Sequence, residues 1–254
     1  AGQGPDFVEA APENWIGVGG RMGRRFRAAT ERYPLVAHGL SLNLGGPAPL
    51  DRGLLDRVAT FLADHGAVLY SEHLAWTGDE GQLYDLLPLP LTAEAARYIG
   101  QRVACVQDHL GQRIAVEPAA YYATPAPPEH SEPEFLAAIV AEADCDVLLD
   151  VNNLEVNRIN HGTDPYAMMA AIPADRVAYI HIAGHRRERE DLAIDSHGAP
   201  VADAVWRLLA AAYERFGARP TLLERDFDLP PLAELMAEVE QVRTVQAGAG
   251  VAAP

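Results

Sequence analysis

Short apolar runs and amphipathic stretches alternate along the whole chain. Seven runs rich in β-branched and apolar residues predict buried strands over residues 6–10, 35–42, 67–74, 113–116, 146–151, 177–182 and 220–223. Between them, apolar residues recur at helical spacing over residues 24–33, 54–65, 92–110, 132–143, 166–172, 202–216 and 232–242. Strand–helix alternation with short connections predicts βα units and a parallel sheet covered by helices.

The repeated βα units predict an α/β fold of the TIM (β/α)8 barrel type. A chain of 254 residues is long enough for such a barrel as one domain, and we assign residues 1–246 to it. The pattern supplies seven strands where a closed barrel has eight, so we expect the first N-terminal strand to be lacking, shortened or hidden. Residues 247–254 are expected to form a disordered tail, and residues 124–133 a mobile loop over the barrel mouth.

Charge and composition narrow the choice of partners. Twenty Lys and Arg against 36 Asp and Glu give a formal charge of −16, and no basic stripe is visible, so we expect no nucleic-acid partner. No apolar run approaches the length of a membrane span, and the N-terminus does not resemble a signal peptide. The two cysteines, Cys105 and Cys145, stand in apolar contexts and are interpreted as reduced core thiols of a cytoplasmic protein.

Metal-binding residue types gather where the predicted strands end. They are Glu9, Glu13, Asn14, His38, Glu72, His73, Glu117, Asp150, Asn152, Asn153, His181, His185, Glu224 and Asp226, with Asp195 and His197 on a loop. A single His after a strand is more often structural than a ligand, and we interpret His65, His109 and His130 in that way. Carboxylates at successive strand ends of a barrel meet at one mouth, where crowding them is costly unless a cation lies between them. The set therefore predicts a site for several divalent ions, bridged by carboxylates.

Several motifs then carry a resemblance to a known family. They are Ser-Glu-His-Leu-Ala-Trp at 71–76, Leu-Leu-Asp-Val-Asn-Asn at 148–153, Asn-His-Gly at 160–162, Ile-His-Ile-Ala-Gly-His at 180–185, Asp-Ser-His-Gly-Ala-Pro-Val at 195–201 and Glu-Arg-Asp at 224–226. In this order they resemble the DUF692 family, the multinuclear non-heme iron-dependent oxidative enzymes, which include the iron subunits of methanobactin and 3-thiaglutamate biosynthesis. The resemblance runs from about residue 6 to residue 239.

The resemblance implies a TIM barrel related to endonuclease IV and xylose isomerase, with two or three irons as Fe(II) or Fe(III) and O2 as co-substrate. It implies oxidation of a residue, often Cys, in a ribosomally made precursor peptide, and a small partner protein that binds the leader. The implied ligands are His38, His73, Glu117, Asp150, His181, Asp195, His197 and Glu224, with Asn153 or His185 completing a third site. Glu117, Asp150 and His185 are the residues expected to act in catalysis.

One departure from the family pattern concerns the substrate. The family usually follows the bridging Glu with Asn-Pro or Asn-Val, whereas this chain has Pro118 directly after Glu117. Two other functions stay open at this point: a redox-neutral isomerase or phosphodiesterase on the same barrel, and a peptide-binding scaffold without metals. A DNA-cutting relative should carry basic loops, which are not seen, and the intact set of ligands disfavours the scaffold.

Overall fold

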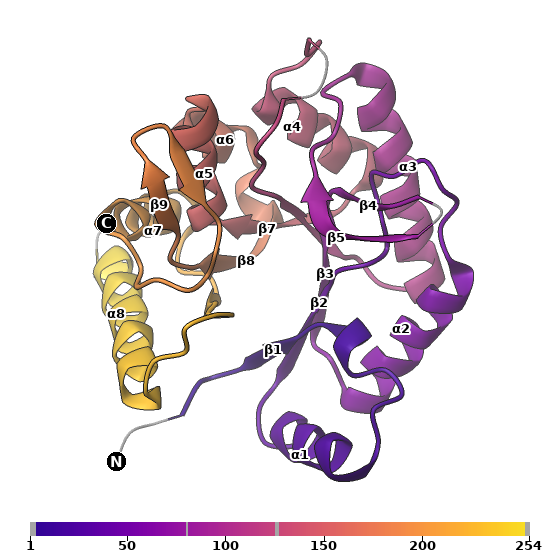
Figure 1. Cartoon of the computed structure of the whole chain (residues 1–254), viewed down its shortest axis with the longest axis vertical. Coiled ribbons are helices and arrows are strands. Elements are labelled where there is room, and N and C mark those ends of the chain that lie inside the picture. Colours follow the sequence, from indigo (N-terminus) through magenta and orange to yellow (C-terminus); the bar gives the residue numbers. More distant parts are fainter. Residues whose placement is uncertain (1–3, 80, 125–126, 252–254) are drawn as a thin grey trace.

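The core of the protein is a parallel sheet that curls into a nearly closed barrel (Figure 1). The computed structural model describes residues 4–79, 81–124 and 127–251. Seven strands follow one another in the sheet, each parallel to its neighbours: β1 (Val8–Ala10), β2 (Leu35–Gly39), β3 (Leu69–Leu74), β6 (Ala115–Pro118), β7 (Asp146–Asp150), β8 (Val177–Ile182) and β11 (Thr221–Leu223). All seven predicted strands are confirmed.

Helices lie around the outside of the strands in Figure 1. They are α1 (Gly20–Thr30), α2 (Arg52–His65), α3 (Ala93–Leu110), α4 (Glu132–Ala143), α5 (Val151–His161), α6 (Pro165–Ala171), α7 (Asp203–Phe216) and α8 (Leu232–Val251), with short 3-10 turns at Pro12–Asn14 and Ala174–Arg176. Side chains cap several of them. The side chains of Asp51 and Thr92 accept hydrogen bonds from the backbone amides of Leu54 and Ala95. Ser131 forms a capping box with Glu134. The seven predicted helices are confirmed, and α5 was not predicted.

The ladder of the barrel is open between β11 and β1. Within the described ranges these two edge strands do not pair, in agreement with the sequence count of seven strands. Helix α8 packs beside this opening, where Arg243 donates to the carbonyl of Gly4 and to the carboxylate of Asp6. Because α8 continues to Val251, residues 247–251 are helical and the prediction of a disordered tail was wrong for them. Residues 252–254 lie outside the described residues.

Two small hairpins rise from the ends of β3 and β8. Strands β4 (Trp76–Gly78) and β5 (Gln82–Leu87) form one, and β9 (Arg186–Arg189) and β10 (Leu192–Ile194) form the other. The second hairpin contains the charged residues 186–191. Part of the predicted loop at 124–133 lies outside the described residues, and its end belongs to α4.

The two cysteines differ in environment. Cys145 is buried at the start of β7, as expected, whereas Cys105 is exposed on α3, so its assignment to the core was wrong. In the described part of the chain, no helix has both the length and the apolar character that crossing a bilayer requires.

Alternation along the strands builds the barrel interior in two layers. One layer is apolar and contains Val36, Ala115, Leu148 and Tyr179. Two residues further along the same strands stand His38, Glu117, Asp150 and His181. Because side chains two apart in a strand point to the same face, the polar residues lie directly above this apolar floor. A larger apolar cluster fills the space between the outer face of the sheet and the helices.

Candidate metal centre

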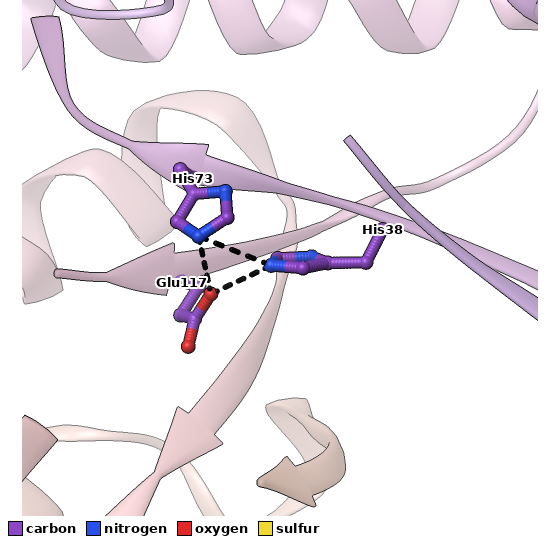
Figure 2. Close-up of side chains that lie close together, drawn as sticks. All are labelled: His38, His73 and Glu117. Carbon is purple, nitrogen blue, oxygen red and sulfur yellow. Dashed lines mark hydrogen bonds and ion pairs between the residues drawn. The ribbon is translucent and has the colours of Figure 1, made fainter. Parts of the chain in front are cut away.

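Three side chains from neighbouring strands converge at the mouth of the barrel. His38 Nε2 lies 2.8 Å from Glu117 Oε2, and His73 Nε2 lies 3.3 Å from the same oxygen. The two imidazole nitrogens are themselves 3.3 Å apart. Figure 2 shows the three atoms facing one another, each side chain coming from a different strand. Two imidazoles and a carboxylate around one point form a ligand set suited to a divalent transition metal.

Two further groups continue this arrangement across the mouth. In the described part of the chain, Glu117, Asp150 and His181 bring ligand atoms within 4.8 Å of one another, and so do Asp150, His197 and Glu224. Glu117 belongs to the first and second groups, and Asp150 belongs to the second and third. Shared carboxylates are the usual bridges between neighbouring ions, so the geometry can hold a row of two or three metals.

Asp150 is positioned by the junction between β7 and α5. Its Oδ1 accepts the backbone amides of Asn152 at 2.6 Å and Asn153 at 2.9 Å, which makes it the N-cap of α5. Its second oxygen is buried without a hydrogen-bond partner. One carboxylate oxygen thus begins the helix, and the other is left for a ligand at the mouth.

Unpartnered buried atoms test whether the site fits metal ions. Among the described residues, nine buried side-chain polar atoms lack a well-aligned hydrogen-bond partner. Five of them line this mouth: Glu117 Oε2, Asp150 Oδ2, Asn153 Oδ1, His181 Nδ1 and His197 Nε2. Buried polar atoms are normally satisfied, and unsatisfied ones call for an ion, a water or a function. Oxygen and imidazole donors of this kind fit divalent metals.

Electrostatics of the mouth follow from the crowding of buried acids and imidazoles. Burial opposes the charged form of His38, but Glu117 outweighs it and raises the pKa of His38 to about 9. Burial opposes the charge of Glu117 as well, yet His38 and His73 hold the pKa of Glu117 below its usual range. For Asp150, burial and the neighbouring Glu117 both act to raise the pKa. Without a cation, protons therefore balance part of the negative charge, and metal ions would replace them.

Seven of the ten predicted ligands belong to the three groups, and the other three lie outside them. His38, His73, Glu117, Asp150, His181, His197 and Glu224 all belong to the three groups. Asn153 lies beside them, with its side-chain Nδ2 3.3 Å from Glu117 Oε1. Asp195 lies at the rim, 2.8 Å from His197 Nε2 and 2.7 Å from the amide nitrogen of Asn152. His185 belongs to none of the three groups, and its Nδ1 is 2.8 Å from Asn152 Oδ1.

Two buried carboxylates belong to the site although the sequence did not place them in the ligand set. Glu9 on β1 reaches across the barrel to His181 Nε2 at 3.1 Å. Glu72 is buried below the β2–α2 connection. It accepts hydrogen bonds from the hydroxyl of Tyr70, at 2.9 Å, and from the backbone amide of Leu42. Burial raises the pKa of Glu72 to about 8. Strand alternation was the available signal for Glu9, which stands two residues after inward-facing Phe7.

An apolar cavity of about 100 Å³ is lined by residues that follow two of the candidate ligands in sequence. Leu74 and Pro118, which line it, directly follow His73 and Glu117 in sequence. The remaining walls come from the β4–β5 hairpin, the connection after β6, and α4, and include Leu86, Tyr121 and Phe135. The residue that departs from the family pattern, Pro118, therefore lines this cavity.

Comparison with known proteins places these observations in a family. A family model described as the RiPP precursor modification enzyme MbnB/TglH/ChrH matches residues 1–247. A UPF0276 protein of Pseudomonas aeruginosa (strain UCBPP-PA14) is 55% identical over 247 residues, which cover 97% of this chain and 87% of that protein. A UPF0276 protein of Nitrosospira multiformis is 52% identical over 242 residues, covering 95% and 86%.

Solved structures support the barrel. D-psicose 3-epimerase from Clostridium cellulolyticum superposes with a TM-score of 0.65 at 13% identity, covering 95% of this chain and 89% of that one. Endonuclease IV from Thermus thermophilus gives a TM-score of 0.58 at 18% identity, covering 96% and 90%. At these identities the likeness concerns the fold alone, which is the xylose isomerase and endonuclease IV type of TIM barrel.

Proposed function

The chain belongs to the MbnB/TglH/ChrH family of RiPP precursor modification enzymes, and on this premise we propose that it is a multinuclear iron enzyme that uses O2 to oxidise a residue of a ribosomally synthesised precursor peptide. The observation that carries the proposal is the row of three His and carboxylate groups that share Glu117 and Asp150. A row of this kind suits a chemistry that needs more than one metal ion.

In this proposal His38, His73 and Glu117 hold the first ion, and Glu117, Asp150 and His181 hold the second. Asp150, His197 and Glu224 would hold a third, with Asn153, Asp195 or His185 as additional ligands. When bound, iron would supply the one-electron chemistry that reaction with O2 requires. The protein orients the imidazoles through their outer nitrogens, as where His73 Nδ1 donates to the carbonyl of Gly39 at 2.8 Å.

The substrate would lie across the barrel mouth, since the βα connections are the surface that adjoins the metals. The apolar cavity lined by Leu74 and Pro118 would receive an uncharged side chain of the peptide. Pro118 and its neighbours line this cavity, so the departure from the family pattern would affect which peptide is chosen, more than how the metals are held.

A small partner protein would hold the leader of the peptide. The arginines of residues 186–189 are another candidate for that contact. In the structure Arg186 pairs with Glu188 at 2.5 Å and Arg189 with Asp191 at 3.5 Å. Residues 186–191 hold three arginines and three carboxylates, so their formal charge sums to zero. A neutral hairpin attracts a charged leader weakly, which favours the partner protein for this role.

The test is co-expression of the chain, the partner and each precursor peptide encoded nearby, followed by intact peptide masses. We expect the mass of one core-peptide residue to change when O2 is present and to stay unchanged in the anaerobic arm. The iron content of the enzyme is measured in the same samples. An unchanged mass for every peptide, with iron verified in place, would contradict the proposal and favour a redox-neutral isomerase or hydrolase.

A further inference from the structure

A chain of four hydrogen bonds links the outer nitrogens of two candidate metal ligands. His38 Nδ1 lies 2.7 Å from Ser71 Oγ, and Ser71 Oγ lies 2.6 Å from the hydroxyl of Tyr179. The Tyr179 hydroxyl donates to Glu9 Oε2 at 2.7 Å, and the same oxygen lies 3.1 Å from His181 Nε2. These side chains come from β2, β3, β8 and β1 and meet inside the barrel, below the nitrogens that face the mouth.

The members of this chain are shielded from water. Ser71 and His181 are fully buried, Tyr179 is 1% exposed and His38 is 5% exposed. The Glu9 side chain is 9% exposed. Water can therefore contribute little to satisfying these groups, and each hydrogen bond has to come from the next side chain.

The number of protons available fixes which group donates and which accepts in each of these hydrogen bonds. The single hydroxyl proton of Tyr179 is donated to Glu9 Oε2. Tyr179 can then only accept from Ser71, and Ser71 can only accept from His38 Nδ1. The neutral, metal-binding form of His38 therefore carries its proton on Nδ1, which leaves the Nε2 lone pair for a metal ion.

The neighbouring ligand His73 shows why His38 needs this chain. The Nδ1 atom of His73 faces the carbonyl of Gly39 at 2.8 Å, and a carbonyl can only accept, so that contact alone fixes the tautomer. His38 instead faces the hydroxyl of Ser71, which can donate or accept. If Ser71 donated, His38 would carry its proton on Nε2 and could not bind a metal there.

We infer that Glu9 is a positioning residue of the metal centre, which sets the metal-binding tautomer of His38 through Tyr179 and Ser71 and orients His181 directly. Glu9 stands on β1, an edge strand of the sheet. Among the described residues, β1 pairs with β2 alone. Its side chain thus connects β1 to β8 across the opening of the barrel and serves two metal positions with one carboxylate. This inference rests on the metal centre of the proposed function, but requires neither iron nor O2.

The test is binding of Co(II) to the metal-free full chain, followed by its visible absorption, together with thermal unfolding without metal. Tyr179→Phe removes the hydroxyl that links Ser71 to Glu9, so Ser71 becomes free to donate its proton to His38. We expect about tenfold weaker Co(II) binding at the His38 position, equivalent to about 1.4 kcal/mol. Tyr213→Phe is the matched control, since Tyr213 is a buried phenol 2.5 Å from Thr221 Oγ1 on the outside of the barrel. It should leave Co(II) binding unchanged.

A double variant distinguishes tautomer control from simple support of the fold. Adding Ser71→Ala to Tyr179→Phe removes the hydroxyl that would donate to His38, so part of the Co(II) affinity should return. Glu9→Ala should weaken Co(II) binding at both positions, because His181 also loses its acceptor. A double variant that binds no better than Tyr179→Phe, or a Glu9→Ala protein that binds like wild type, would overturn the inference. Wild type that binds no Co(II) would overturn the metal centre itself.

Discussion

Glu117→Gln should abolish metal binding at the first two positions, with an affinity loss of more than about 100-fold. The substitution keeps the shape of the side chain but removes the negative charge between His38, His73 and His181. An uncharged amide is a weak ligand for a divalent ion and cannot bridge two of them. We expect the variant to show little bound metal after anaerobic loading, and no modification of the peptide.

The control for this variant is His109→Ala. His109 lies near the end of α3, where its Nε2 is 2.9 Å from Asp56 on the surface, away from the strand ends. Metal content measured by elemental analysis should equal that of wild type. If the two variants lose the same amount of metal, Glu117 is not a bridge and the mouth has been wrongly assigned.

Asp150→Asn should remove the second and third positions and leave the first. An asparagine still caps a helix, so α5 can begin as it does in wild type. The charge that the second and third groups share is lost, whereas His38, His73 and Glu117 remain. We expect about one metal ion per chain in place of two or three, and loss of peptide oxidation, because the chemistry requires more than one ion.

Asp164→Asn is the matched control, because Asp164 caps α6 in the same way, accepting the amide of Tyr166 at 2.9 Å, and belongs to none of the three groups. Metal per chain and thermal unfolding should both match wild type. An Asp150→Asn protein that keeps a full complement of metal would show that the second and third groups do not depend on this carboxylate.

Local pattern was enough to predict the sheet and most of the helices. The strands are short apolar runs with polar residues in or just after their last positions, and α2, α3 and α7 each bury one apolar face. Helix α5 was not predicted because residues 151–157 mix apolar residues with polar ones that are also buried, so no apolar face stands out in the sequence. Its start was nevertheless present in the sequence, as an aspartate followed by two asparagines.

The composition of the site was also predictable, but its pairing was not. Strand ends in a parallel barrel must meet, which brought His38, His73, Glu117, Asp150 and His181 together in the prediction. Which residue serves which neighbour depends on side-chain direction across the barrel. Glu9 reaches His181 from a strand far away in sequence, and His185 turns to Asn152 although it follows the same strand as His181. Sequence spacing carries no information on either contact.

The most direct test of the account is a count of irons in protein loaded with Fe(II) under anaerobic conditions. Elemental analysis gives the number of irons per chain, and Mössbauer spectroscopy after brief exposure to O2 shows whether the irons are magnetically coupled through a shared ligand. We expect at least two irons per chain, coupled through a carboxylate, because the groups share Glu117 and Asp150. No more than one iron at saturation, or irons that show no coupling, would contradict it.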